Sequence, residues 1–213
     1  MDIKYVFWDW NGTLIDDASL CVSILNKLLF QEKKDPIDLD YYRCNFSLPV
    51  SNFYTLLSLP NRGSDFDVVS NYFINTYRQF WHECSLQPNC EFVLDNLRKS
   101  GVKQYILSAG MQKDVEGFIN YHKLGCFFSR ICGTKDIYAD GKLSFGLQLM
   151  KSLKVNPSEI LLVGDTLHDH EVGSYIGCQT LLFTGGHNAK TVLERSKCDM
   201  IDDLSEVLDF VLH

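Results

Sequence analysis

The sequence predicts an α/β protein, with a doubly wound, Rossmann-like parallel sheet as its core and an inserted all-helical cap subdomain. Two observations support this fold class. Several short segments are continuously apolar, as strands buried on both faces of a parallel sheet are, and each precedes a helical pattern. One long stretch near the amino terminus keeps helical spacing throughout. A chain of 213 residues suits one such domain with an inserted unit.

The core elements are expected to alternate along the chain. The first strand covers residues 5–8 and ends in an acid, Asp9. Further strands are expected at 102–110, 127–133, 159–165, 178–186 and 199–202. Helices are expected beside the sheet at 111–124, 144–153, 166–177, 187–196 and 204–212. In a doubly wound sheet the ligand crevice lies outside the carboxyl ends of the strands, so residues that end strands are the first candidates for a site.

Residues 15–88 form the predicted helical cap, which leaves 1–14 and 89–213 as the core. Apolar residues recur there at helical spacing with no convincing strand between them, and four prolines break the stretch into separate helices. Within it, residues 65–84 carry a stripe of apolar side chains that includes Phe73 and Tyr77. We interpret this stripe as core packing rather than as an aromatic ligand box.

Charge and cysteine usage exclude several classes of function. A net charge of −7 and the lack of a Lys/Arg cluster argue against nucleic acid as a partner. No apolar run approaches the ~20 residues that span a bilayer, and no leader pattern is present, so a cytoplasmic protein without membrane association is expected. The eight cysteines are scattered and are interpreted as reduced core residues. Without a CxxC pair, oxygen ligands are the better expectation for any metal.

Polar residues end three of the predicted strands. These residues are Asp9, Ser108 and Asp165, and Asp169 lies one helical turn beyond Asp165. Two carboxylates within reach of each other repel unless a cation lies between them, so Asp9 and Asp165 together predict a hard divalent metal, with Mg2+ as the expected cofactor. Such a metal would attract a phosphate. Each residue alone has a structural explanation as a turn or cap residue, and only the ordered combination favours a catalytic site.

Four motifs, in order along the whole chain, resemble those of the haloacid dehalogenase-like hydrolase superfamily. FWDWNGTLID (7–16) is similar to its first motif and YILSAG (105–110) to its second. Lys142 in DGKLSFG corresponds to the third, and LLVGDTLHDHE (161–171) to the fourth. The helical insertion directly after the first motif matches the cap of the phosphoglycolate phosphatase-like branch. The resemblance implies a phosphatase that acts on a small phosphorylated metabolite.

The resemblance also implies roles for the acidic residues. Asp9 would attack phosphorus in line and form an aspartyl-phosphate, which splits a difficult hydrolysis into two displacements. The implied metal ligands are Asp9, the backbone carbonyl of Asn11, Asp165 and Asp169, the last either as a direct ligand or by orienting a metal-bound water. Thr13, in the first motif, is included among the catalytic candidates, with bracing of the turn as its structural alternative.

The remaining implied roles concern the phosphate. Ser108 and the amides of Ala109 and Gly110 would hydrogen-bond its oxygens. Lys142 would neutralise the phosphate and keep the attacking carboxylate ionised. We choose Lys142 because it precedes the predicted helix that leads into the strand ending at Asp165, and Lys135 is the reserve.

Asn11 occupies the position where phosphatases of the superfamily usually carry a second aspartate, the general acid and base. An amide cannot transfer a proton, a role worth ~10^2 to 10^4 in rate. Three explanations stay open: a leaving group that departs unprotonated, such as an acyl phosphate or anhydride; another acid, with Asp16, Asp17, His168 and His170 as candidates; or a weak relative that binds a phosphorylated ligand. We hypothesise slow catalysis on alkyl phosphates, which Asn11→Asp is expected to accelerate.

Two other functional classes are less well supported. A dehalogenase also uses the strand-end aspartate but needs neither a metal nor the late acid pair. A signalling receiver or phosphate-sensing module keeps its acids in an early cluster and lacks a helical insert of about 70 residues. The cap is expected to select the substrate by closing over the crevice, and the sequence indicates no oligomeric state. The residues considered as candidates to face the crevice from the cap are Asp16, Asp17, Tyr41, Tyr42, Arg43, Asn52 and Arg62.

Overall fold

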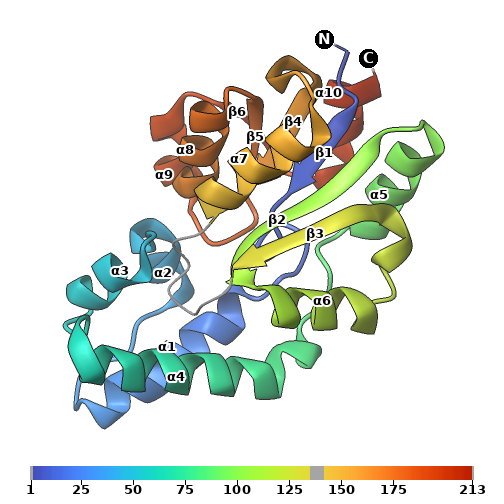
Figure 1. The fold of residues 1–213 in the computed structure, drawn as a ribbon. Helices are drawn as coiled ribbons and strands as arrows, with labels where there is room; N and C mark the ends of the chain where they lie inside the picture. Colours follow the sequence, from blue (N-terminus) through green and yellow to red (C-terminus); the bar gives the residue numbers. More distant parts are fainter. Residues whose placement is uncertain (1, 135–141, 213) are drawn as a thin grey trace.

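The computed structural model describes residues 2–134 and 142–212, which contain one sheet of six parallel strands (Figure 1). The strand order is β3-β2-β1-β4-β5-β6. The strands are β1 (Tyr5–Trp8), β2 (Lys103–Met111), β3 (Phe128–Thr134), β4 (Ile160–Gly164), β5 (Gln179–Phe183) and β6 (Asp199–Ile201). The strand order reverses between β1 and β4, which is therefore the switch point of a doubly wound fold. The predicted fold class is confirmed.

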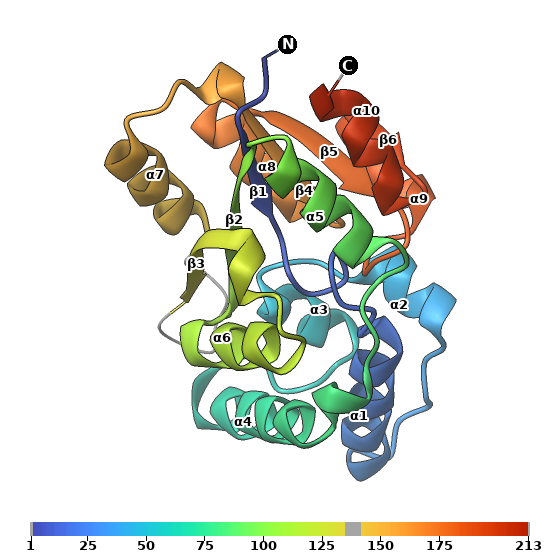
Figure 2. The ribbon, with the colours of Figure 1, turned by 90° about the vertical axis from the view of Figure 1, so that its right-hand side faces the viewer.

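Helices cover both faces of the sheet, which explains the continuously apolar strands. On β1, Val6 and Trp8 belong to one buried cluster and Phe7 to the other. The α-helices from Cys90 onward are α5 (Cys90–Lys99), α6 (Gln112–Tyr121), α7 (Lys142–Leu153), α8 (Leu167–Ile176), α9 (Lys190–Leu193) and α10 (Val207–Leu212). The cluster of Phe7 includes residues of α7 and α8, and the other includes residues of α5, α6 and α10 (Figure 2).

Four α-helices lie between β1 and α5. They are α1 (Ala18–Gln31), α2 (Leu39–Asn45), α3 (Val50–Leu56) and α4 (Gly63–Phe80). Both views show them gathered beyond one end of the sheet (Figures 1 and 2). This helical content agrees with the predicted insertion, whose boundaries at 14/15 and 88/89 and whose role as a cap stay predictions. None of the described helices is both long and apolar enough to cross a membrane.

Two helix boundaries differ from prediction in ways that affect the site. The helix expected at 144–153 begins at Lys142, so this lysine is its first described residue rather than a residue before it. The helix expected at 187–196 shrinks to α9, Lys190–Leu193, and a short turn. Asn188 explains the second difference, because its side chain bonds the backbone of Leu167 and Phe46 and so holds the segment after β5 as a loop.

Candidate active site

Three carboxylates converge at the switch point of the sheet. Asp9 follows β1, Asp165 follows the neighbouring strand β4, and Asp169 lies in the first turn of α8. One oxygen of each lies within 4.8 Å of the others, and all three residues are buried. We call this group the carboxylate cluster. Asp9 and Asp165 are therefore close enough to share one cation, as their positions at strand ends predict.

Lys142 provides a buried positive charge beside the carboxylate cluster. Its Nζ lies 2.8 Å from Asp9 Oδ1 and also forms an ion pair with Asp169 Oδ1. The side chain is 2% exposed, which is rare for a lysine without partners. Burial lowers the pKa of Lys142, but the charges of Asp169 and Asp9 outweigh it and raise the pKa above its ordinary value, so the ammonium stays charged. The reserve candidate, Lys135, lies outside the described residues.

One lysine does not neutralise the carboxylate cluster. Burial raises the pKa of Asp9 to about 7; Lys142 opposes this shift, and the charges of Asp169 and Asp165 add to it. Burial likewise raises the pKa of Asp165 to about 6, against the opposing charge of His187 and with the added charge of Asp169. The cluster is thus a buried region of excess negative charge built from hard oxygen donors, which is the environment that a small divalent cation prefers.

Hydrogen bonds fix the orientation of the two later carboxylates. Thr13 Oγ1 donates to Asp165 Oδ1 at 2.7 Å, and the backbone N–H of His187 donates to Oδ2 at 2.6 Å. Asp169 Oδ2 accepts from the hydroxyl of Thr166 at 2.7 Å and from its N–H at 3.0 Å, which closes a capping box at the start of α8. Thr13 therefore braces Asp165 and is not among the residues that line the cavity.

Gly12 lets the loop after β1 pass directly over Asp165. Its φ is +74°, and a Cβ there would lie 2.2 Å from Asp165 Oδ2. Only glycine adopts this backbone conformation without strain and leaves room for the carboxylate. The glycine of the first motif is thus required by the approach of the loop to the cluster.

The second motif supplies polar groups to the same cavity. Ser108 is buried at the end of β2, and the N–H of Gly110 donates to its Oγ at 3.0 Å. Ser108, Ala109 and Gly110 line a cavity of about 190 Å³ together with Asp9, Asn11 and Lys142. The structure therefore brings these predicted residues together around one space, whereas Thr13, Asp165 and Asp169 are not among the residues that line it.

The side chain of Asn11 is part of a network of hydrogen bonds with Asp17 and Tyr77. Its Nδ2 donates to Asp17 Oδ2 at 2.7 Å and contacts the Tyr77 hydroxyl at 2.9 Å, and that hydroxyl donates to the same carboxylate oxygen at 2.6 Å. The N–H of Gly12 donates to Asp17 Oδ1 at 2.9 Å. Because Asp17 only accepts hydrogen bonds, an amide at position 11 suits this network, whereas a carboxylate there would face another carboxylate.

His187, which the sequence reasoning did not single out, completes the network. Its Nε2 lies 3.2 Å from Asp17 Oδ1 and its Nδ1 lies 2.9 Å from the Tyr42 hydroxyl. Burial lowers the pKa of His187, but the charges of Asp17, Asp165 and Asp9 and the hydrogen bond to Asp17 raise it to about 9. The imidazole is therefore protonated at neutral pH and donates both N–H groups.

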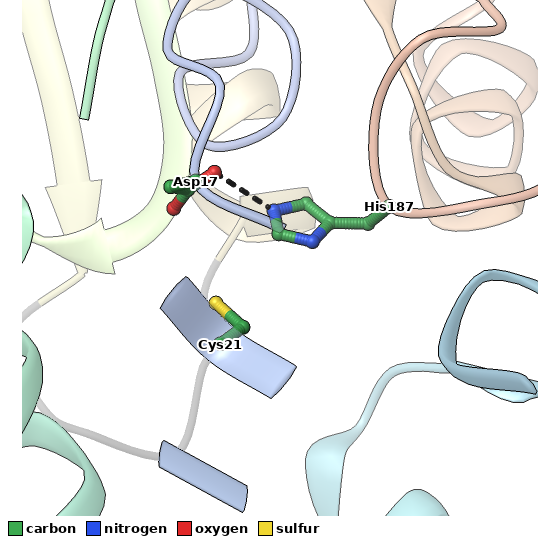
Figure 3. A group of neighbouring side chains, drawn as sticks. All are labelled: Asp17, Cys21 and His187. Atoms are coloured by element: carbon green, nitrogen blue, oxygen red, sulfur yellow. Dashed lines mark ion pairs between the residues drawn. The ribbon is translucent and has the colours of Figure 1, made fainter. Parts of the chain in front are cut away.

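The group formed by Asp17, Cys21 and His187 consists of an ion pair beside a thiol. Figure 3 shows the carboxylate of Asp17 facing the ring of His187, with Cys21 of α1 next to them. Burial raises the pKa of Cys21 well above its ordinary value, so the sulfur keeps its proton. A metal ion bound there would have to displace the protons of the thiol and the imidazole, which opposes binding at neutral pH.

Of the four acids considered from sequence as replacements for position 11, Asp17 is the one that lines the cavity. Although burial raises the pKa of Asp17, the charge of His187 and hydrogen bonds lower it below its ordinary value, so this carboxylate stays ionised. Asp16 is exposed, His168 faces Glu171, and His170 contacts Ser174 and Cys198. None of Asp16, His168 and His170 lines the cavity. Of the candidate cap residues, Asp17 and Tyr42 line it.

The network predicts the outcome of changing Asn11. Asn11→Asp places a second buried carboxylate against Asp17, and we expect it to lower the free energy of unfolding by about 2 to 4 kcal/mol. The exchanged pair Asn11→Asp/Asp17→Asn restores an amide donor opposite a carboxylate, and it should recover most of this loss. Chemical unfolding of the three proteins measures the effect.

The exchanged variant also separates folding from catalysis. It provides an ionisable group at position 11, so it is expected to raise turnover of an alkyl phosphate, as the sequence analysis proposed for the single change. A single Asn11→Asp variant as stable as the unmodified protein would contradict the network described above.

The fold and the carboxylate site define the class of the protein. A family model described as haloacid dehalogenase-like hydrolase matches residues 6–183. The chain therefore belongs to the haloacid dehalogenase-like hydrolase family. The earlier resemblance is confirmed.

Individual relatives are more distant. The chain is 29% identical over 216 residues to the pyrophosphatase PpaX of Bacillus cereus. This match covers 98% of this chain and 96% of that protein. It is 27% identical over 143 residues to a phosphoglycolate phosphatase of Vibrio vulnificus, a match that covers 66% of this chain and only 63% of that relative. A solved haloacid dehalogenase-like hydrolase of Bacteroides fragilis has the same fold, with a TM-score of 0.85 at 18% identity over 97% of this chain and 100% of the other.

Proposed function

We propose that this protein is a Mg2+-dependent phosphatase that hydrolyses a small phosphorylated metabolite through an aspartyl-phosphate on Asp9. The observation that carries the proposal is the environment of Asp9. This carboxylate lines the cavity, contacts Lys142 and lies within 4.8 Å of Asp165 and Asp169. Family membership and the names of the two relatives, a pyrophosphatase and a phosphoglycolate phosphatase, support the same chemistry.

The donor set fits Mg2+. Three buried carboxylates beside one lysine keep the pKa values of Asp9 and Asp165 high, and a hard divalent cation relieves that crowding. Asp9, Asp165 and the main-chain carbonyl of Asn11 would hold the ion. Asp169 holds Lys142 and accepts a hydrogen bond from Thr166, and it would either bind the ion directly or orient a coordinated water. When bound, the ion supplies Lewis-acid stabilisation of the transferring phosphoryl group.

The reaction proceeds in two balanced displacements. A carboxylate oxygen of Asp9 forms a bond to phosphorus while the bond to the leaving oxygen breaks with its electron pair. Water then attacks the same phosphorus and displaces the carboxylate, and the proton that water loses is balanced by the one that the leaving oxygen gains from solvent. Ser108 and the N–H groups of Ala109 and Gly110 hold phosphate oxygens, and Lys142 offsets their charge.

The proton balance limits the leaving groups that this site can release. Asn11 does not ionise, Asp17 is already charged, and His187 directs its two N–H groups at Asp17 and Tyr42. None of these side chains protonates the leaving oxygen without breaking the buried network. A leaving group that is stable as an anion therefore suits the site best, and alkyl phosphates should react slowly.

Metal removal tests this function. Phosphate release from a panel of small phosphate esters is expected to stop with a chelator and to return with Mg2+. The affinity for Mg2+ should fall as the pH falls, because the ion binds only the ionised forms of Asp9 and Asp165, whose pKa values are about 7 and about 6. Between about pH 8 and about pH 5.5 we expect a loss of at least ~10-fold in affinity, measured by calorimetric titration.

Three results would contradict the proposal. Phosphate release that is unaffected by chelation would remove the metal from the mechanism. Halide release from a 2-haloacid without Mg2+, in the absence of phosphate release, would favour the dehalogenase alternative, and Mg2+-dependent binding of the esters without turnover would favour the weak, ligand-binding alternative.

A further inference from the structure

The cavity beside Asp9 has apolar walls built mainly by the inserted helices. Phe46, Val50, Tyr54, Phe73 and Ile74 line it on that side. Its volume of about 190 Å³ exceeds the ~150 Å³ of apolar space that holds a benzene ring in an engineered cavity. This volume includes the space beside Asp9, Ser108 and Lys142 where the phosphate would lie, so it matches one ring together with its phosphate.

Among the residues that the structure describes, the cavity wall offers no unpaired cation for a second anionic group. Among the described residues that line it, the basic side chains are Lys142 and His187, and both are paired with buried carboxylates. The lining also includes Asp114, which is paired with Arg78. A carboxylate or a second phosphate on the substrate would be buried there without a partner, which costs far more than burying an uncharged group.

One polar atom of the wall has no partner within the protein. Ser70 is buried and lines the cavity, and its Oγ has no hydrogen-bond partner in the described structure. Buried hydroxyl groups are nearly always hydrogen-bonded, so this one indicates a ligand group that supplies the missing bond.

Helix α4 sets the distance between that hydroxyl and the catalytic end. Ser70, Phe73, Ile74 and Tyr77 recur at the spacing of one helix face, and all four line the cavity. Tyr77 contacts Asn11 beside the nucleophile, and Ser70 lies seven residues earlier, or about 10 Å along the axis at ~1.5 Å per residue. Part of the stripe that the sequence analysis interpreted as core packing is thus cavity wall.

We propose that the substrate is the phosphate monoester of an uncharged phenol that carries one hydrogen-bonding group at the end remote from the phosphate. This inference rests on the proposed phosphatase function and deepens it. The aromatic walls match a ring, the unpaired hydroxyl of Ser70 matches its remote polar group, and Asn11 matches a phenolate that leaves without a donated proton. Phosphoglycolate and pyrophosphate, whose leaving groups are anionic, do not match.

Turnover and binding of matched esters test the inference. With Mg2+, kcat/KM for phenyl phosphate should exceed that for 4-carboxyphenyl phosphate and for phosphoglycolate by at least ~100-fold, because both place a carboxylate in the cavity. Cyclohexyl phosphate fills the same space but has an alkoxide leaving group, and its kcat should be lower than that of phenyl phosphate by at least ~100-fold. Dissociation constants measured on Asp9→Asn give the binding order without requiring turnover.

Two cavity variants test the individual contacts. Ser70→Ala should lower the ratio of kcat/KM for 4-(hydroxymethyl)phenyl phosphate to that for phenyl phosphate about fivefold, since it removes one hydrogen bond. Ile74→Lys, compared with Ile74→Met as the size-matched control, should raise the ratio for phosphoglycolate over phenyl phosphate at least ~10-fold.

The outcomes separate this inference from the function on which it rests. The phosphatase assignment would be contradicted if the unmodified protein turned over none of the esters faster than Asp9→Asn does. The binding order would still decide the ligand class. Turnover or binding that favours phosphoglycolate or pyrophosphate, or a kcat for cyclohexyl phosphate equal to that for phenyl phosphate, would overturn the inference and leave the phosphatase assignment intact.

Discussion

Replacing Asp9 by asparagine is expected to abolish phosphate release, with a loss in kcat on the order of 10^4-fold or more. The amide has nearly the shape of the carboxylate but is a poor nucleophile and a weaker metal ligand. The fold should survive, because burial already raises the pKa of Asp9 to about 7 and a neutral side chain suits this position. The unfolding temperature of the metal-free variant should therefore equal or exceed that of the unmodified protein, and initial rates measure the loss.

Asp16→Asn provides the matched control for Asp9→Asn. It removes a carboxylate from the same loop, but this residue is exposed and does not line the cavity. Its rate and stability should stay close to those of the unmodified protein. Equal activities of the two variants would contradict the role of Asp9, whereas loss of folding in Asp9→Asn alone would contradict the account of its pKa.

Replacing Lys142 by methionine should produce the second large effect. The change removes the ammonium that contacts Asp9 at 2.8 Å and also pairs with Asp169. The three buried carboxylates then keep only the partial compensation that the charge of His187 gives to Asp165, and we expect a loss of about 3 to 5 kcal/mol in the free energy of unfolding at neutral pH. Phosphate release should fall at least ~10^2-fold, because charge on the transferring phosphoryl group loses a partner.

Lys151→Met is the control for this change, since Lys151 lies exposed near the end of the same helix, α7. The destabilisation of Lys142→Met should also shrink as the pH falls below about 7, because protonation of the carboxylates relieves their repulsion. A Lys142→Met variant whose stability is independent of pH would show that this lysine does not compensate the cluster.

The sequence predicts most of the fold because each core strand is marked twice. A segment such as ILLVG is continuously apolar, and a polar residue that caps the next helix soon follows it, as Thr166 caps α8. The helical segment after β1 is equally clear from its spacing. The helix predicted at 187–196 was wrong only at 187–189, because hydrogen bonds between the Asn188 side chain and residues remote in sequence hold that segment as a loop.

The geometry of the site could be predicted where strand ends determine it. Asp9 and Asp165 end neighbouring strands, so their approach follows from sheet topology alone. His187 could not be found in this way, since a lone histidine after two glycines carries no pattern. The charge of Asp17 was also beyond sequence reasoning, because it depends on that histidine and on Tyr77. Asn11 was noticed as an anomaly, and the structure gives its physical reason.

The covalent intermediate on Asp9 is the claim on which the other roles depend, and trapping it is the most direct test. The protein should be mixed with Mg2+ and a small aryl phosphate, quenched during turnover and treated with borohydride, which reduces an aspartyl-phosphate to homoserine. Peptide mass spectrometry should then find homoserine at position 9 and at no other aspartate, and none in a sample without substrate. Active protein that shows no modification at Asp9, or shows it at another carboxylate, would contradict the mechanism.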